Sequence, residues 1–161
     1  MTVEEYNKSV DSYADGIYRF ALKTLKDQEK AKDTVQDTYE KLWVKHRDVS
    51  FEKVKSYLFT TAYHASIDLI RKEKKNVDYE SAPAVGLSSL EQYSDIREVL
   101  NKAVELLPDI QKSVILLRDY EGYSYEEVGE ITGLNESQVK VYIFRARLFL
   151  KNYLVSIENI I

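Results

Sequence analysis

A run of aromatic, hydroxyl and basic residues between positions 57 and 75 is the first part of the sequence that could do chemistry. Aromatic rings interleaved with cations can stack on unpaired bases and follow a phosphate backbone. At helical spacing, the side chains opposite the apolar stripe of this segment are Tyr57, Thr60, Thr61, His64, Asp68 and Arg71, followed by Lys72, Lys74 and Lys75. Core packing is the competing interpretation for the rings of Tyr57 and Phe59, because aromatic side chains are often buried.

A second candidate surface combines three carboxylates with one amide. The spacing of three, four and seven residues places Asp33, Gln36, Asp37 and Glu40 on one polar helix face, opposite the apolar side chains. Carboxylates and amides are suited to charge-assisted hydrogen bonds with arginines of a protein partner. The alternative is a solvated face without a partner, which is the commoner meaning of a charged helix face.

A third candidate surface lies on the helix expected after Asn135. Gln138 and Arg145 carry the amide and guanidinium groups that read base edges in duplex DNA, and Val141 and Phe144 could meet thymine methyl groups. Val141, Phe144 and Leu148 also form a second apolar stripe on a helix that already has one. We expect this stripe to be covered in the idle protein, by the other half of the chain or by a partner, the alternative being isolated exposed apolar residues.

The sequence lacks the groups that most enzymes and metalloproteins need. It has no Cys, only two His and no glycine-rich phosphate loop. His64 and Asp68 are four residues apart, but two such ligands do not make a metal site by themselves. We therefore expect no enzymatic activity, no cofactor and no bound metal.

Apolar side chains at intervals of three and four residues predict three amphipathic helices, over residues 3–26, 29–46 and 53–75. Their buried stripes are expected to include Tyr6, Val10, Tyr13, Ile17 and Phe20 in the first, Ala31, Val35, Thr38, Leu42 and Trp43 in the second, and Val54, Leu58, Ala62, Ala65 and Leu69 in the third. The pattern stops at Asn76, and Pro83, Gly86 and several serines then indicate a linker.

Helical periodicity resumes at Ile96, Leu100, Ala103 and Leu107 and is interrupted by Pro108. A further helix follows and ends near Gly122. The helix start and stop signals after Gly122 are the most informative in the chain. They consist of a capping box from Ser124 to Glu127, a helix-ending Gly133, and a new cap at Asn135 with Gln138 three residues on. This order predicts a helix-turn-helix within an all-α fold of two small helical domains.

The net charge of −4 argues against a protein that coats nucleic acid through bulk positive charge. The formal net charge is +2 for residues 1–75, −3 for residues 76–97 and −3 for residues 98–161. The longest apolar run, Val114 to Leu117, is far too short to span a membrane, and the first ten residues carry no basic and apolar leader. We therefore expect a cytoplasmic protein without membrane insertion.

With these residues in view, the chain resembles bacterial RNA polymerase sigma factors of the extracytoplasmic-function class. The segments that resemble region 2 are residues 31–39 with Leu42 and Trp43, and residues 54–75; those that resemble region 4 are residues 107–128 and Phe144 to Arg147. The resemblance divides the chain into region 2 (1–76), an acidic flexible linker (77–97) and region 4 (98–161).

The resemblance implies a function for each candidate surface. The stripe from Asp33 to Glu40 would dock on core RNA polymerase. The residues from Tyr57 to Lys75 would recognise and help to melt the −10 element. The −35 element would be contacted by Arg118, Gln138, Lys140, Val141, Phe144 and Arg145. An anti-sigma factor is a further expected partner.

The sequence departs from the family's usual residues at Tyr57, His64, Val141 and Tyr142, which implies unusual preferences at both DNA elements. A stand-alone helix-turn-helix regulator that binds duplex operators is the alternative function. It leaves the stripe at Asp33 to Glu40 and the residues from Tyr57 to Lys75 without a role.

Overall fold

The computed structural model of the chain describes residues 1–76 and 96–160, and every regular element in those ranges is a helix. The first half contains α1 (Val3–Leu25), α2 (Gln28–Lys45), the 3₁₀ turn η1 (Phe51–Lys53) and α3 (Val54–Asn76). The second half contains α4 (Ile96–Leu106), α5 (Asp109–Ile115), the π-helical turn η3 (Leu116–Tyr120), α6 (Tyr125–Thr132) and α7 (Glu136–Ile160). The predicted all-α fold is confirmed, and the expected linker lies outside the described residues except at its last two positions, which begin α4.

Side-chain caps set the starts of the first two helices. The Thr2 hydroxyl accepts a hydrogen bond from the Glu5 N–H, and the Glu5 carboxylate accepts one from the Thr2 N–H, which forms a capping box for α1. Asp27 caps α2 by accepting from the Lys30 N–H at 3.1 Å. Between them, Lys26 adopts a left-handed conformation (φ 59°) and turns the chain back on itself.

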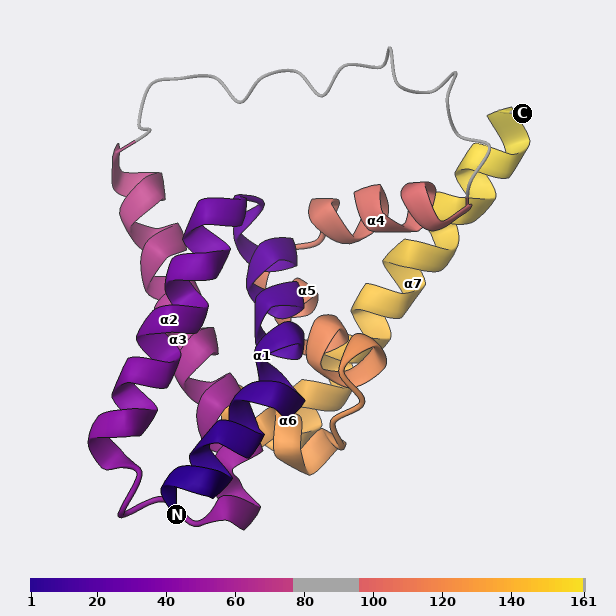
Figure 1. Cartoon of the computed structure of the whole chain (residues 1–161). Helices are drawn as coiled ribbons and strands as arrows, with labels where there is room; N and C mark the ends of the chain where they lie inside the picture. The colour runs from indigo at the N-terminus through magenta and orange to yellow at the C-terminus, as the bar shows by residue number, and fades with distance from the viewer. Residues whose placement is uncertain (77–95, 161) are drawn as a thin grey trace.

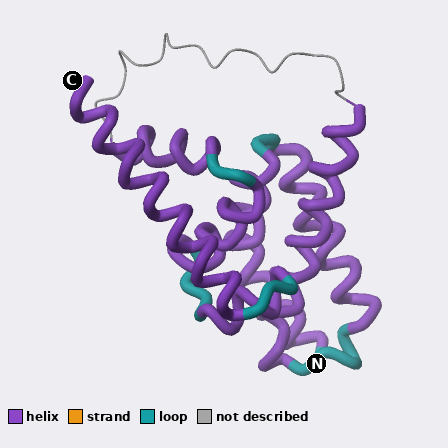
Figure 2. The backbone as a smooth tube through the Cα atoms, turned by 180° about the vertical axis from the view of Figure 1, so that it is seen from behind, coloured by secondary structure: helices purple, strands orange, loops and turns teal. Residues whose placement is uncertain are grey.

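The two halves pack directly against each other (Figure 1). Helices α1, α2 and α3 form a bundle, and the helices from α4 to α7 lie along one side of it, with α6 against α3. The view from behind shows α7 as a long helix along the outer edge of the molecule, with only short loops between the other elements of the described chain (Figure 2).

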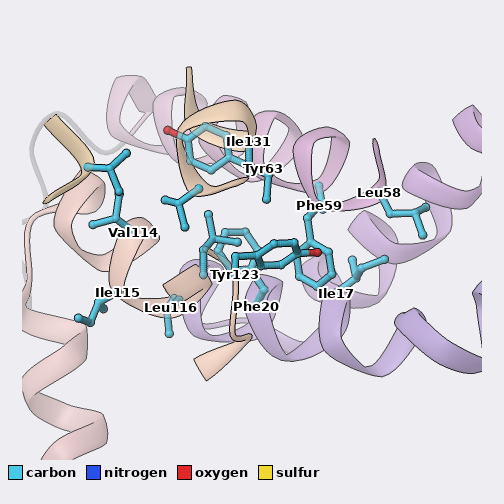
Figure 3. Packing of buried hydrophobic residues seen from close by; sticks show 14 of the residues in the cluster. Ile17, Phe20, Leu58, Phe59, Tyr63, Val114, Ile115, Leu116, Tyr123 and Ile131 are labelled. Atoms are coloured by element: carbon cyan, nitrogen blue, oxygen red, sulfur yellow. The ribbon is translucent and has the colours of Figure 1, made fainter. Parts of the chain in front are cut away.

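The larger of two hydrophobic clusters in the described residues runs through both halves. Buried residues of α1 and α3, such as Phe20 and Phe59, belong to the same cluster as Leu116, Tyr123 and Ile131 of the second half. Figure 3 shows the Tyr123 ring among these side chains. The region-2-like and region-4-like halves are therefore joined by a shared interior as well as by the chain itself.

Three residues expected in buried stripes are exposed instead. Val10 is 36% exposed, because the buried Ser9 takes the inward position at that level of α1, where its carbonyl accepts a hydrogen bond from the Tyr39 hydroxyl. Trp43 is 46% exposed, because its neighbour Leu42 fills the core position. Ile96 is 70% exposed at the first turn of α4.

Candidate nucleic-acid interface

The first turns of α3 border a hollow of about 720 Å³. Tyr57, Thr60 and Thr61 line one wall, and the residues before α3 form the other with Asp48, Val49, Ser50 and Lys53. The Thr61 hydroxyl donates to the Tyr57 carbonyl at 2.8 Å, so its lone pairs are left as acceptors for a ligand. A ring, several hydroxyl groups and an ammonium group around one hollow can hold a base out of its stack. Ser50 and Lys53 lie in the loop at about residues 47–55, which the resemblance implies would help to hold a flipped-out base.

The remainder of the predicted α3 surface divides into exposed and engaged groups. His64, Asp68, Arg71, Lys72 and Lys75 are exposed. Lys74 is engaged with the second half, since its ammonium group donates to the Asp109 carboxylate at 2.8 Å. Phe59 is 2% exposed, so for this ring the core-packing alternative is correct.

The polar stripe on α2 is fully on the surface. Asp33, Gln36, Asp37 and Glu40 are all exposed, and the Gln36 amide donates to the Glu40 carboxylate at 3.3 Å. The ion pairs among the described residues do not include Asp33, Asp37 or Glu40, although Asp33 and Asp37 line a hollow of about 350 Å³ with Lys30, Lys41 and Lys72. We call these four residues the docking stripe.

The helix-turn-helix begins and ends its helices where the capping signals in the sequence predict. The Ser124 hydroxyl accepts from the Glu127 N–H at 3.1 Å and the Glu127 carboxylate accepts from the Ser124 N–H at 3.0 Å. Gly133 ends α6 in the left-handed conformation (φ 79°). Gly129 permits the tight turn, because a Cβ there would lie 2.8 Å from the Leu134 carbonyl oxygen.

The start of α7 uses one of the residues predicted to read DNA. Asn135 and Gln138 cap the helix reciprocally, with the Gln138 N–H donating to Asn135 Oδ1 at 2.8 Å and the Asn135 N–H donating to Gln138 Oε1 at 3.0 Å. The Gln138 oxygen is therefore occupied, and its NH₂ group remains as the donor for a base edge.

The outward face of α7 is apolar and basic. Phe144 is 67% exposed and Val141 is 45% exposed. Arg145 is exposed beside the Tyr142 ring, and Lys140 pairs with Glu136 of the preceding turn at 3.4 Å. A hollow of about 490 Å³ lies on this face between Tyr125 and the α7 residues Lys140, Val141, Ile143, Phe144 and Arg147.

Arg118 has an internal function in this structure. Its guanidinium group donates to the Tyr123 carbonyl at 2.9 Å and stacks over the Tyr125 ring at 4.6 Å. Arg118 thus braces the loop before α6. Arg147 is also engaged, since it donates to both carboxylate oxygens of Asp119, which raises the pKa of Arg147.

The second apolar stripe of α7 is not covered by the other half of the chain. Val141, Phe144 and Leu148 are 45%, 67% and 47% exposed. The expectation that the first half of the chain covers this stripe is therefore wrong in the structure. The reason is that α7 contacts the first half only weakly, whereas α6 packs against α3.

The contact between the halves, which we call the seam, centres on Tyr123. This side chain is 1% exposed, its ring meets the Phe59 ring edge-on at 5.2 Å, and the Lys55 ammonium lies 4.3 Å from its centre. Its hydroxyl group has no hydrogen-bond partner, and burial raises the pKa of Tyr123.

Charged groups surround the seam. Arg19 donates to both carboxylate oxygens of Glu121 at 3.3 and 3.4 Å, and the Lys23 ammonium lies 3.9 Å from the centre of the Tyr120 ring. Glu130 of α6 lines the same hollow as Tyr57, so a carboxylate from the helix-turn-helix faces the place where a base would enter. The two candidate DNA surfaces are thus held in one closed body.

No cluster of three or more His, Asp or Glu side chains within the described residues 1–76 and 96–160 could hold a metal ion. No helix in the same ranges is both long and apolar enough to cross a membrane.

Comparison with known families decides what kind of protein carries these surfaces. The family profile described as sigma-70 region 2 matches residues 10–76, and the profile described as sigma-70, region 4 matches residues 97–150. The chain belongs to the sigma-70 family. Its similarity to named members places it in the extracytoplasmic-function class, and it is a sigma factor of RNA polymerase.

Three curated relatives illustrate the similarity. The ECF RNA polymerase sigma factor SigM of Bacillus subtilis is 32% identical over 157 residues, covering 94% of each chain. Sigma factor SigV of the same organism is 31% identical, covering 85% of this chain and 83% of the relative. SigW, also from Bacillus subtilis, is 28% identical, covering 90% and 86%.

Two solved structures share the fold over most of the chain. The sigma factor RpoE of Bartonella quintana, solved in complex with the anti-sigma factor NepR, matches with a TM-score of 0.78 and 26% identity, covering 94% of this chain and 98% of that one. CnrH, solved with the cytosolic domain of CnrY, shares the fold with a TM-score of 0.70 and 22% identity, covering 94% and 88%.

Proposed function

We propose that the docking stripe on α2 binds core RNA polymerase, that α3 captures the unpaired −10 element, and that α7 reads the −35 element in the major groove. In this proposal residues 1–76 act as region 2, residues 77–97 as the linker and residues 98–161 as region 4. The hollow beside Tyr57 carries the proposal, because a helix-turn-helix regulator of duplex DNA has no use for it.

The α3 hollow supports a mechanism of promoter opening. A base leaves the duplex at an unstacking cost of a few kcal/mol, which stacking on an aromatic ring and contacts in a pocket can offset. Tyr57 supplies the ring, Thr60 and Thr61 supply hydroxyl groups, and Arg71 and Lys72 are exposed further along α3 to follow the phosphates. Melting is therefore driven by capture of the displaced strand and uses no bond-breaking chemistry.

The outer face of α7 supports recognition of duplex DNA. Arg145 can donate two hydrogen bonds to a guanine edge, and Phe144 and Val141 offer apolar contact to thymine methyl groups. The ammonium of Lys140 can exchange Glu136 for a phosphate. Arg118 donates one of its five N–H groups to the loop before α6, which positions α6 and α7 and leaves donors for a backbone phosphate.

Both DNA surfaces cannot be used while the seam is closed. The names −10 and −35 place the two elements about 25 base pairs apart, roughly 85 Å along B-DNA. The longest helix of the chain, α7, has 25 residues and is about 37 Å long. We infer that the halves separate on the promoter, and that residues 77–95 can bridge up to about 65 Å between them.

An anti-sigma factor is the partner that the exposed face of α7 favours. Val141, Phe144 and Leu148 form an apolar stripe flanked by the cations Lys140 and Arg145. Such a face is complementary to an amphipathic helix that carries acidic residues, and binding there would block the −35 surface. The solved complex of RpoE with NepR shows that a related chain binds an anti-sigma factor.

The function is tested by run-off transcription with purified bacterial core polymerase over a library of random promoters. We expect transcripts only when the chain is present, with both DNA elements shared among the selected promoters. Duplex binding that is unaffected by core polymerase, without transcripts, would instead support the stand-alone regulator. Any catalytic turnover by the chain alone would contradict the proposal that synthesis belongs entirely to the polymerase.

The docking stripe is tested separately by charge reversal. Asp37→Lys should weaken binding to core polymerase about tenfold or more, because it sets an ammonium against the partner's cations. Asp15→Lys is the matched control, since Asp15 is exposed on α1 away from the stripe. Equal affinity of the Asp37 variant and the wild type would refute this assignment.

A further inference from the structure

The docking stripe does not end at Glu40. Trp43 and Val44 follow it by three and four residues, so they lie on the same face of α2. Trp43 is 46% exposed and Val44 is 82% exposed. From Asp33 to Val44 the face is about 16 Å long, with carboxylates along the first two turns and apolar groups at the end.

The indole of Trp43 is held in place although it is exposed. It stacks on the His46 ring with 4.4 Å between centres and 12° between planes. The Tyr6 ring also meets the indole edge-on, with 5.1 Å between centres, and the Tyr6 hydroxyl donates to the Tyr39 carbonyl at 3.0 Å. An exposed aromatic group that is already fixed loses little rotamer freedom on binding, which is the property of the residues that dominate protein interfaces.

We propose that Trp43 and Val44 form an apolar anchor at the end of the docking stripe, where they receive an apolar side of a basic helical segment of core polymerase. This inference rests on the proposed function of the stripe and adds the residues that supply most of its contact energy. The carboxylates of Asp33 and Asp37 orient the partner's cations, but exposed ion pairs contribute little binding energy. The indole of Trp43 contributes more, because its contact area is removed from water on binding.

The charge on the face argues against a second copy of the chain as the occupant. A two-fold dimer through this patch would bring two docking stripes together, each with three carboxylates. The repulsion disfavours self-association, whereas a partner with cations opposite Asp33 and Asp37 is attracted. The face therefore fits a basic and apolar helix.

The single Trp of the chain makes the anchor directly observable. Replacing it with 5-hydroxytryptophan during expression gives a fluorophore that can be excited apart from the tryptophans of the polymerase. We expect core polymerase to shift its emission and to reduce its quenching by acrylamide several-fold. Unchanged quenching in the saturated complex would overturn the proposal, because the indole would then remain in solvent.

Two substitutions test the energetic contribution. Trp43→Ala should weaken core binding about ten- to a hundredfold. Val44→Arg should weaken it without disturbing the fold, since Val44 has almost no internal contacts and the new cation opposes those of the partner. Phe149→Ala is the matched control, because Phe149 is also exposed and stacked on a neighbour, Tyr153.

The result also separates this inference from the function on which it rests. If Asp37→Lys weakens core binding while Trp43→Ala and Val44→Arg do not, the stripe ends at Glu40 and the anchor is refuted. If none of the three changes binding, the assignment of the α2 face fails as a whole. Formation of dimers by the wild type that Val44→Arg abolishes would favour a second copy and overturn the polymerase as occupant.

Discussion

The unpartnered hydroxyl of Tyr123 leads to a prediction of unusual sign: Tyr123→Phe should stabilise the chain. A buried hydroxyl group without a partner costs about 1–3 kcal/mol relative to its hydrated state in the unfolded chain. Phe keeps the ring contacts with Phe59 and Lys55. After allowance for the small void left behind, the free energy of unfolding should rise by about 1 kcal/mol, or roughly 3 °C in melting temperature.

The matched control is Tyr39→Phe. The Tyr39 hydroxyl is also buried, but it donates to the Ser9 carbonyl at 2.7 Å. Its removal should lower the free energy of unfolding by about 1 kcal/mol, because the chain loses a buried hydrogen bond. Urea denaturation followed by circular dichroism measures both variants. If Tyr123→Phe destabilises the chain as much as Tyr39→Phe does, the account of the seam is wrong.

The same experiment has a pH dependence. Because burial raises the pKa of Tyr123 above the ordinary value of 10.0, the unfolded chain loses this proton first as the pH rises. The wild type should therefore lose stability above about pH 10, whereas Phe has no proton to lose at this site. The advantage of Tyr123→Phe should be constant at lower pH and grow above that point. A constant difference throughout would show that the Tyr123 hydroxyl is accessible to water.

Three further substitutions test other parts of the structure. Glu121→Arg should open the seam by setting two cations together and should enlarge the radius of gyration in X-ray scattering; the double variant with Arg19→Glu should restore the compact form. Arg145→Ala should weaken transcription from cognate promoters by about tenfold or more while core binding, measured by competition, stays unchanged. Ser124→Ala removes the acceptor for the Glu127 N–H and should lower the free energy of unfolding by about 1 kcal/mol in urea denaturation.

The parts of the fold that depend on near neighbours could be predicted from the sequence. The capping box at Ser124, the helix end at Gly133 and the cap at Asn135 each depend on groups within four residues. The helix-turn-helix follows from them, because each signal has one conformation that satisfies the backbone. The same locality explains why the three helices of the first half were found.

Contacts between distant segments could not be predicted in this way. Tyr123 lies in a short loop without periodicity, and its burial depends on Phe59, more than sixty positions earlier. Arg118 has the residue type of a phosphate contact, and the hydrogen bond that it donates to the Tyr123 carbonyl could not be read from its spacing. The spacing of apolar residues in α2 allowed either Leu42 or Trp43 to face the core. Only the packing of α1 and α3 against α2 places Leu42 inside and leaves Trp43 exposed.

The interior shared by the two halves should lower the fraction of molecules that are ready to bind the polymerase at a promoter. If promoter use requires the open form, the apparent affinity of the chain for the polymerase–promoter complex equals the intrinsic affinity of the open form multiplied by the fraction of molecules that are open. A closed form favoured a hundredfold would raise the concentration needed for half-occupancy about a hundredfold, equivalent to about 2.7 kcal/mol. Residues such as Phe59 and Tyr123 would then set how much protein a cell must make before its polymerase responds, although they touch neither the polymerase nor DNA.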